Sequence, residues 1–449
     1  MSTSFTRSNG AQVAIRVNPV AFSQRCDLSV PSKYRRLISL MRNEWRSPEA
    51  LAAMQNAKLR RLVDHAYTNV PFYRRLFREA GAVPADIRSA ADLVRLPVID
   101  KSMLRVRPVE DIVDRRMRPE QLIERYTSGS TGAPFRFFVD AAFDAQCKAQ
   151  YLRSYLTNGR GLFDRVLRFS SHGPVPDTWF QKLGLLREIK VACDRPPDAL
   201  LTSFVETAAD IVEGYPSTLL ALSSAIERTN PEFKKPKLVF SDSELLTEAV
   251  RTSIQANIGA PVLDVFGTFE TDNIAYECNK RSGYHVAIDC VVAEIVAADK
   301  PVEPGERGEL VCTVLDNYAM PFIRYKLGDI ATALPTPCKC GRGLPLMNVA
   351  WGRTRDCVVR GDGTMEAPIE FTAGIDRIIE FAFQYQIAQT GYDSFRIALV
   401  PRRSLEARDR ALIETLVRKR YPGATVTIAE VDEIPREASG KSRIFVCEL

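Results

Sequence analysis

The sequence lacks a long apolar run, a secretory signal and a large supply of histidine. No stretch reaches the roughly 18 consecutive apolar residues that cross a bilayer, so we expect no membrane partner. The first 30 residues show no charged segment followed by an apolar one, which argues against secretion and favours a cytoplasmic protein. Histidine occurs 3 times in 449 residues, and we find neither a Ser/His/Asp triad nor a Cys/His nucleophile pair.

The charge balance is mild, and the lysines and arginines are scattered. A formal net charge of +6 suits small anionic ligands such as nucleotides, but no basic block indicates a nucleic-acid partner. The 10 cysteines, without a secretory signal, indicate reduced thiols. A composition of 45% hydrophobic and 26% charged residues is that of a soluble globular protein, and 449 residues exceed one ordinary core, so we expect at least two domains.

Apolar spacing predicts helices first and alternating strands and helices afterwards. Helical periodicity covers residues 32–80, with Ser47 as an N-cap ahead of Pro48. From Leu122 onward the pattern alternates: we predict strands at 165–170, 236–241 and 261–267, and a helix at 247–258. This alternation predicts a largely parallel sheet with helices on its faces, and ligands in such sheets lie beyond the carboxyl ends of the strands.

The pattern changes in the last third of the chain. Residues 286–350 indicate a β-rich subdomain, and a separate pattern after Asp356 predicts helices near 370–383 and 408–420 and strands at 395–400 and 424–431. We therefore predict an α/β fold, with a large N-terminal domain of mixed or parallel sheets flanked by helices and a small α+β C-terminal domain. The expected bounds are 1–33 for an N-terminal extension, 34–355 for the large domain and 356–449 for the small one.

The stretch from Tyr126 to Phe135 has the composition of a phosphate-binding loop. Glycines let the backbone pass close to a ligand, successive N–H groups form a concavity for anions, and hydroxyls add donors. The stretch lacks the Lys-Ser/Thr ending of the common P-loop, and taken alone it is equally consistent with a solvent-exposed turn. The residues concerned are Ser128, Gly129, Ser130, Thr131 and Gly132.

Four further motifs follow this loop in order: Phe266–Glu270, Arg324–Asp329, Gly352–Asp356 and Pro435–Lys441. Together with the loop, they resemble the ordered motif set of the adenylate-forming superfamily, which contains acyl-CoA synthetases, peptide-synthetase adenylation domains and luciferases. Within this superfamily the chain is most similar to the phenylacetate–CoA ligase group. The stretches that carry this second likeness are 70–74, 96–101 and 214–217, and the resemblance extends from about Tyr34 to the C-terminus.

The resemblance implies a role for each matching residue. Lys441, Glu270 and Thr131 are predicted to be catalytic: the lysine would offset charge between the substrate carboxylate and the α-phosphate of ATP, and the glutamate would bind Mg²⁺. The resemblance also implies a small domain that rotates between two half-reactions, and it is compatible with a homodimer. The predicted cofactor-binding residues are Ser128, Gly129, Ser130, Thr131, Gly132, Ser243, Glu244, Asp264, Phe266, Gly267, Asp329 and Arg353.

Three positions depart from the family pattern, the first being Phe266, which stands where the family usually has a tyrosine near the adenine. Phe269 stands where relatives have a threonine or serine, which removes a hydroxyl that would meet the nucleotide phosphate; Thr268 and Thr271 are the candidates to replace it. Arg355 stands where many relatives have the hinge aspartate, and Asp356 is its neighbour, so the pivot is one of these two residues.

Cys278, His285, Cys338 and Cys340 form a second constellation. Three thiolates and an imidazole suit tetrahedral Zn²⁺, and the residues after Cys338 include the turn formers that a metal knuckle needs. A single residue separates Cys338 from Cys340, fewer than the usual two to four. We predict a structural zinc site remote from the chemistry; the alternative is two loops with unrelated cysteines.

The motifs favour ATP-dependent activation of a carboxylic acid to an acyl-AMP, followed by transfer to the thiol of CoA, with ATP, Mg²⁺ and CoA as cofactors. The resemblance implies an aryl or arylacetic acid, although 241–243 is polar enough to suit a hydroxylated or amino-substituted one. A second hypothesis passes the acyl group to a carrier-protein phosphopantetheine or to an amine. A third, of another class, is a non-catalytic nucleotide-binding relative, which Phe269 favours and the retained Lys441, Glu270 and Asp329 oppose.

Overall fold

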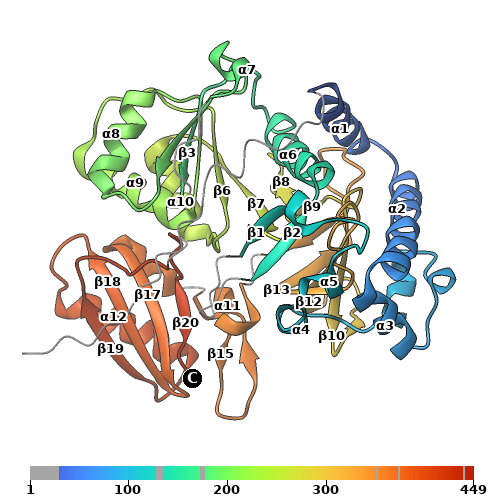
Figure 1. The fold of residues 1–449 in the computed structure, drawn as a ribbon. Coiled ribbons are helices and arrows are strands. Elements are labelled where there is room, and N and C mark those ends of the chain that lie inside the picture. Colours follow the sequence, from blue (N-terminus) through green and yellow to red (C-terminus); the bar gives the residue numbers. More distant parts are fainter. Residues whose placement is uncertain (1–29, 128–134, 172–176, 350–351, 373–374, 438–439) are drawn as a thin grey trace, which may run out of the picture.

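A computed structural model describes residues 30–127, 135–171, 177–349, 352–372, 375–437 and 440–449. A large body carries most of the chain, and a smaller C-terminal unit lies against one end of it (Figure 1). The predicted phosphate loop, 128–132, and the predicted extension up to residue 29 lie outside the described residues. Among the helices that are described, none combines the length and apolar character needed to cross a membrane.

One mixed sheet organises the large body, and it changes from parallel to antiparallel at a single strand. Strands β4, β3, β5, β6 and β7 pair in parallel, whereas β7 pairs antiparallel with β8 and every later neighbour is antiparallel. The β-rich segment expected at 286–350 is therefore the antiparallel half of this sheet. In spatial order the strands are β11 (Lys300–Pro301), β10 (Val291–Ala297), β12 (Arg307–Val314), β13 (Tyr325–Leu334), β14 (Leu346–Asn348), β9 (Tyr284–Val286), β8 (Asp272–Glu277), β7 (Val262–Thr268), β6 (Leu238–Asp242), β5 (Ile211–Gly214), β3 (Val166–Ser170) and β4 (Glu188–Ala192).

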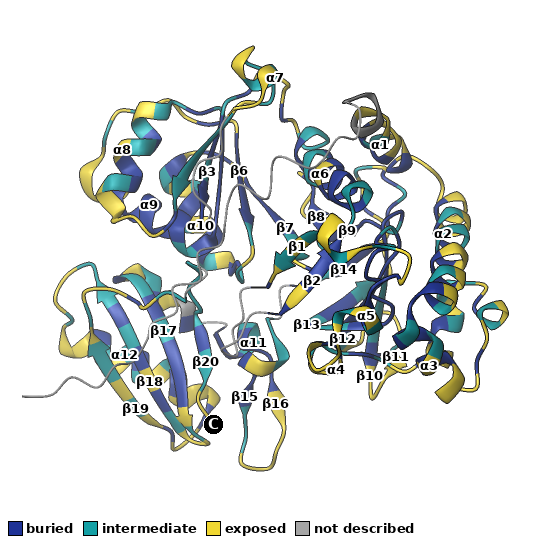
Figure 2. Cartoon of the chain, viewed as in Figure 1, coloured by how far each residue is buried: buried dark blue, intermediate teal, exposed yellow. Residues whose placement is uncertain are grey.

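Helices cover both faces of the parallel half, as the alternating pattern predicts. Adjacent residues of a strand face opposite sides, so Val166 packs with Tyr155 of helix α6 (Ala141–Leu156), while Leu167 packs with Leu219 of helix α9 (Pro216–Thr229). The strands between these helices are buried along most of their length (Figure 2). The other helices here are α8 (Pro197–Thr207) and α10 (Glu248–Ile258), beside α9, and the short α7 (Trp179–Lys182).

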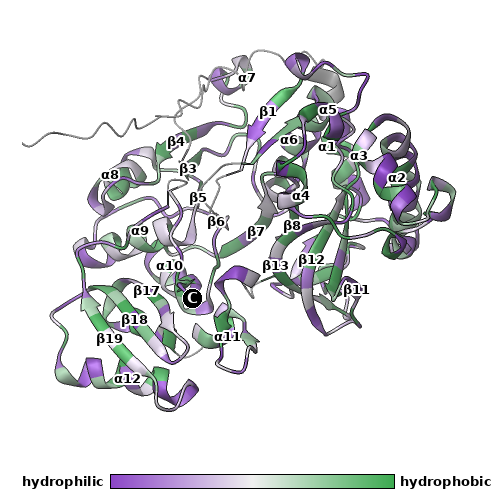
Figure 3. Cartoon of the chain, turned by 60° about the horizontal axis from the view of Figure 1, so that its bottom comes forward, coloured by the Kyte–Doolittle hydropathy of each residue, from purple (hydrophilic) through white to green (hydrophobic). Residues whose placement is uncertain are grey.

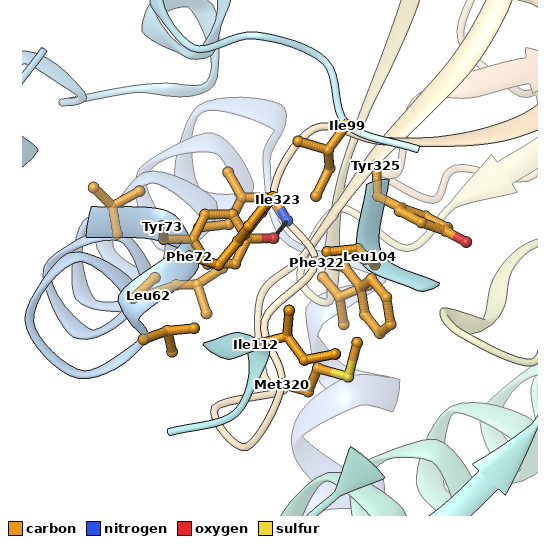
Figure 4. Close-up of a cluster of buried hydrophobic side chains, with 14 of the residues drawn as sticks. Leu62, Phe72, Tyr73, Ile99, Leu104, Ile112, Met320, Phe322, Ile323 and Tyr325 are labelled. Atoms are coloured by element: carbon orange, nitrogen blue, oxygen red, sulfur yellow. Dashed lines mark hydrogen bonds between the residues drawn. The ribbon is translucent and has the colours of Figure 1, made fainter. Parts of the chain in front are cut away.

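The N-terminal helices build a separate core against the antiparallel half, whose strands are largely hydrophobic (Figure 3). At its centre, the Tyr73 hydroxyl donates to the carbonyl of Pro321 at 2.8 Å and accepts from the N–H of Ile323 at 3.0 Å (Figure 4). This core holds Tyr325, which reaches the functional site. The helices are α1 (Val30–Asn43), α2 (Pro48–Asn69), α3 (Pro71–Glu79), α4 (Lys101–Arg105) and α5 (Val109–Ile112); a hairpin of β1 (Ile123–Tyr126) and β2 (Arg136–Val139) follows.

The C-terminal unit has its own four-stranded sheet and core. Its strand order is β19 (Thr425–Glu430), β18 (Ser394–Pro401), β17 (Ala382–Gly391) and β20 (Phe445–Cys447). Helix α12 (Ala407–Arg420) packs on this sheet. The hairpin β15 (Val358–Val359) and β16 (Met365–Glu366) and helix α11 (Pro368–Thr372) precede it. The predicted fold class, a large domain followed by a small α+β unit, is confirmed.

One element predicted in this unit is wrong. The helix expected over 370–383 is only α11, which ends at Thr372, followed by a 3₁₀ turn at Ile375–Glu380 and by strand β17 from Ala382. Strand β17 lies in the middle of its sheet between β18 and β20. Only the last two residues of the predicted helix, Ala382 and Phe383, fall in β17; Ala382 is buried there and pairs with Pro401 of β18, and this long-range pairing outweighs the local helical spacing. The other 3₁₀ turns are Pro84–Asp86, Ala90–Arg95, Pro119–Gln121 and Thr354–Asp356.

Candidate active site

A cleft of about 160 Å³ lies at the carboxyl ends of the parallel strands and extends to the C-terminal unit. This is the position that the sheet topology predicts for a ligand. The cleft brings together residues from five of the sequence segments singled out above. The predicted site residues that line it are Ser243, Glu244, Asp264, Phe266, Gly267, Asp329, Arg353 and Lys441.

Lys441 enters this cleft from the small unit. Its ammonium nitrogen lies 5.9 Å from the ring centroids of both Tyr215 and Phe269. Burial lowers the pKa of Lys441, and the nearby positive charge of Arg353 lowers it further. Lys441 therefore lies in the cleft between the body and the small unit, and its catalytic role stays a prediction.

The backbone around Lys441 is fastened to the body by hydrogen bonds and close packing. Ser442 donates its N–H to Glu244 Oε1 at 2.6 Å, and Arg436 donates to Thr218 Oγ1 at 3.1 Å. Gly440 has a φ of +77°, and a Cβ atom there would lie 2.8 Å from the sulfur of Cys193. Glycine is therefore the residue that this approach permits.

Glu244 of the body accepts a hydrogen bond from the segment that carries Lys441. It follows β6, and its carboxylate accepts from the N–H and the hydroxyl of Ser217 at 2.9 and 3.0 Å, in addition to Ser442. Burial raises its pKa. Its neighbour Ser243 has a φ of +68°, a strained conformation for a residue with a side chain, which turns the chain sharply at the edge of the cleft.

Asp329 lies on β13 beside Arg353. Its Oδ1 faces Arg353 Nε at 3.4 Å, and the two residues form an isolated backbone bridge. Its Oδ2 is buried and has no hydrogen-bond donor among the described residues. Burial raises the pKa of Asp329. A buried acceptor without a donor is costly unless a ligand supplies one, and the vicinal hydroxyls of a ribose would do so.

Glu270 and Gly267 lie at the end of β7. A Cβ atom on Gly267 would lie 2.2 Å from the carbonyl oxygen of Asp272, so the tight passage of β7 beside β8 requires a glycine. Glu270 is buried, accepts from the Tyr325 hydroxyl at 3.1 Å, and lies 3.8 Å from Lys101 Nζ. These contacts fix one of its two oxygens.

Asp264 and Phe266 occupy the part of β7 that faces the cleft. The Asp264 carboxylate accepts from the hydroxyls of Ser241 and Tyr284. Burial and the charge of Glu277 raise its pKa to about 7. Asp264 is thus already satisfied within the body, whereas Phe266 presents a half-buried ring to the cleft.

The phosphate loop is outside the described residues, but its two ends are described. Thr127 donates its N–H to the carbonyl of Phe135 at 3.0 Å, and Phe135 donates its N–H to Thr127 Oγ1 at 3.2 Å. The hairpin therefore closes directly below the loop. Lys101 Nζ lies 5.9 Å from the centroid of the Phe135 ring. An ammonium group thus stands between the base of this hairpin and Glu270.

Sequence reasoning missed the roles of Lys101, Tyr215 and Tyr325 in this site. Lys101 and Tyr215 lie in stretches used for the family resemblance, which was the available signal, but nothing in the sequence showed where their side chains lie. The suggestion that Thr268 or Thr271 supplies the missing hydroxyl is not favoured by the geometry. Their hydroxyls lie 3.0 Å apart and each accepts an N–H within the same turn.

The segment 352–356 connects the body to the small unit. Gly352 has a φ of +93°, and a Cβ atom there would lie 2.9 Å from Pro368. Arg443 donates to Asp356 Oδ1 at 3.0 Å, while Arg355 Nε lies 3.7 Å from the same oxygen. Asp356 therefore links the connecting segment to Arg443, which lies just before strand β20. Which of Arg355 and Asp356 acts as the pivot stays a prediction.

The four predicted zinc ligands lie together, and none of them lines this cleft. Their ligand atoms are all within 4.8 Å of one another, with Cys278 Sγ 3.6 Å from Cys338 Sγ and Cys340 Sγ 3.4 Å from His285 Nε2. Zinc–sulfur and zinc–nitrogen bonds of about 2.3 and 2.05 Å imply tetrahedral edges of about 3.8 Å between sulfurs and about 3.6 Å between sulfur and nitrogen. The observed spacings are close to these edges, and 3.6 Å is too long for a disulfide bond.

The chain is similar in sequence to known acid–coenzyme A ligases. No protein-family model matches the chain. The chain is 29% identical over 360 residues to the phenylacetate–coenzyme A ligase of Thermus thermophilus, which covers 76% of this chain and 78% of that protein. It is 26% identical over 448 residues to the phenylacetate–coenzyme A ligase of Escherichia coli, covering 90% and 96% of the two chains.

Solved structures show the same likeness. A structure of 2-hydroxyisobutyryl-CoA ligase in the postadenylation state with R3-HIB-AMP superposes with a TM-score of 0.73 at 21% identity, over 90% of each chain. The same enzyme in the thioesterification state, with 2-HIB-AMP and CoA, gives 0.61 at 22% identity, over 91% and 92%. The fold is therefore that of the adenylate-forming CoA ligases. In sequence, the chain is similar to four phenylacetate–coenzyme A ligases, at 26–29% identity over 72–90% of its length.

Proposed function

We propose that the protein is an AMP-forming carboxylic acid–CoA ligase. In the first half-reaction an oxygen of the acid attacks the α-phosphorus of ATP, and the bond to the β-phosphate breaks to release pyrophosphate. In the second, the thiolate of CoA attacks the acyl carbon and AMP leaves. The single observation that carries this proposal is the ammonium of Lys441 in the same cleft as Asp329 and Arg353.

Each side chain then has a task that its surroundings suit. The buried, unpaired Oδ2 of Asp329 accepts from the ribose hydroxyls. Lys101 neutralises phosphate charge beside the base of the loop hairpin. Glu270 offers Mg²⁺ the carboxylate oxygen that Tyr325 leaves open. Lys441 offsets the charge that gathers as the acid approaches the α-phosphate, which is electrostatic stabilisation by a positioned group.

The small unit would have to leave this arrangement before CoA can react. Lys441 and its flanking contacts fill the junction, as adenylation requires, and the superposition is closer to the postadenylation state of the structural neighbour than to its thioesterification state. We propose a rotation about 355–356, so that the large domain ends at 355 and the small mobile one begins at 356.

The acid is best sought among aryl and arylacetic acids, because the homologues are named phenylacetate–coenzyme A ligases. Purified protein should release pyrophosphate from ATP and Mg²⁺ with at least one acid of a panel that also includes hydroxylated and amino-substituted members. Chromatography of the products, with CoA, a phosphopantetheinylated carrier protein or an amine present, identifies the acceptor. Silence across the panel counts against the proposal, and a product with the carrier alone would replace CoA as acceptor.

We propose in addition that Cys278, His285, Cys338 and Cys340 hold one structural Zn²⁺. Their near-tetrahedral spacing supports this, and three of the four side chains are buried. Zinc would join two parts of the sheet. One is the loop after β8 together with strand β9, and the other is the loop between β13 and β14. In the sheet, these parts are connected only by the pairing of the short strands β9 and β14. Metal analysis of protein purified under reducing conditions should find about one zinc per chain; Cys338→Ser should lose it and lower the unfolding temperature. A zinc content near zero in the unmodified protein would contradict this proposal.

A further inference from the structure

The hairpin turn between β7 and β8 carries Phe269, an aromatic side chain at the position where the family resemblance leads us to expect a threonine or serine. The turn is held by paired contacts between Thr268 and Thr271, and Asp272 beyond it has a φ of +59°. This closed turn projects Phe269 from the body, so that the ring remains 38% exposed although it belongs to a buried site.

The ammonium of Lys441 lies near the ring of Phe269. Its nitrogen lies 5.9 Å from the centroid of Phe269 and equally far from the centroid of Tyr215, which stands on a different element, at the start of α9. Tyr215 is buried, and its hydroxyl lies 3.1 Å from Ser171 Oγ, which fixes the orientation of the ring. Two rings supplied by the body thus flank a charge supplied by the tail.

Within the described residues, no carboxylate oxygen lies within 4.0 Å of Lys441 Nζ. Ring faces carry negative electrostatic potential and attract a cation, by about 0.5–1 kcal/mol when exposed and about 2 kcal/mol when desolvated. Unlike a carboxylate, a ring does not form a strong ion pair that would keep the ammonium from the incoming phosphate. The rings of Phe269 and Tyr215 can therefore position the ammonium of Lys441 and still let it move to the phosphate.

We propose that Phe269 and Tyr215 form an aromatic clamp that positions Lys441 for adenylation and stabilises the docked state of the tail. The proposal rests on the proposed function for its catalytic consequence, but the clamp exists in the ligand-free protein. In this proposal, Phe269 contacts Lys441, whereas a threonine or serine at the same position would contact the nucleotide. Phe269 and Tyr215 act through Lys441 and are positioning residues.

The first test does not depend on catalysis. Ligand-free protein is treated with an amine-acetylating reagent, and the acetylation rate of Lys441 is followed by peptide mass spectrometry relative to the exposed Lys300. Phe269→Leu and Tyr215→Leu should raise the relative rate by about 3- to 30-fold, the range that loss of a cation–π contact implies. Phe269→Tyr and Tyr215→Phe keep the rings and should stay within about 2-fold of the unmodified protein.

The second test separates the half-reactions. Phe269→Leu should lower kcat for pyrophosphate release by about 3- to 30-fold, with little change in KM for ATP, and should leave thioester formation from a preformed acyl-adenylate nearly unchanged. Phe269→Tyr should restore adenylation. The clamp is overturned if the leucine variants match the unmodified protein in both tests, if tyrosine fails to rescue, or if both half-reactions fall equally. Lack of activity in the unmodified protein would instead refute the proposed function, and the acetylation test would still decide on the clamp.

Discussion

Replacing Lys441 by alanine should abolish most adenylation without unfolding the protein. Loss of one preorganised transition-state donor costs about 3–4 kcal/mol, or about 10²- to 10³-fold in rate. The structure separates this effect from stability: among the described residues no carboxylate is left unpaired when the ammonium is removed, and burial already disfavours the charged lysine. We therefore expect the free energy of unfolding to change by no more than about 2 kcal/mol, the size of a lost contact between the ammonium and a ring.

The assay measures the two half-reactions separately. Pyrophosphate release under saturating ATP and acid reports adenylation, and CoA thioester formation from a synthetic acyl-adenylate reports the second step. Lys419→Ala is the matched control, because Lys419 is an exposed lysine on helix α12 of the same unit. The reasoning is refuted if Lys441→Ala retains a third or more of the adenylation rate, or if thioester formation falls by the same factor.

Three further outcomes follow from the site. Asp329→Ala should weaken ATP binding by about 10-fold or more in calorimetry, because a buried acceptor for the ribose is lost; unchanged affinity would remove Asp329 from the nucleotide site. Gly440→Ala should impair adenylation more than thioester formation, since its Cβ would meet Cys193 and the φ of +77° disfavours a side chain; equal effects would show that the docked backbone is not specific to one step. Asp264 has a folded pKa raised from 3.8 to about 7, so its protonated form stabilises the fold at low pH and this contribution is lost as pH rises towards and through about 7. Urea titrations should therefore show Asp264→Asn losing less stability than the unmodified protein between pH 5 and pH 8, and parallel losses would contradict the shifted pKa.

Much of the fold follows from local patterns. The expected helix at 247–258 is α10, capped by Thr247, and Ser47 accepts from the N–H of Ala50 as an N-cap should. Strand and turn periodicity also place the ends of β6 and β7, and hence the cleft, correctly. These elements are set by spacing and by caps a few residues apart, which a sequence displays directly.

What the sequence could not predict depends on long-range contacts. Tyr325 meets Glu270 and Lys101 meets Glu270 only because the N-terminal core brings distant segments together. The last two residues of the helix expected at 370–383 belong to β17 for the same reason, since the partner strands of β17 lie elsewhere in the chain. The roles of residues 128–132 stay predictions, as does the bound metal in the cysteine cluster.

The change of direction at β7 limits how the chain can vary in length. That one strand is parallel to β6 on one side and antiparallel to β8 on the other, and within seven residues it carries Asp264, Phe266 and Gly267 before the turn that holds Phe269 and Glu270. Because side chains alternate, inserting one residue would reverse the face of everything beyond it. Insertions, tags or reporter loops should be tolerated instead at the exposed tip of the β15–β16 hairpin, 361–363, and the spacing from Asp264 to Glu270 should stay constant in any functional variant.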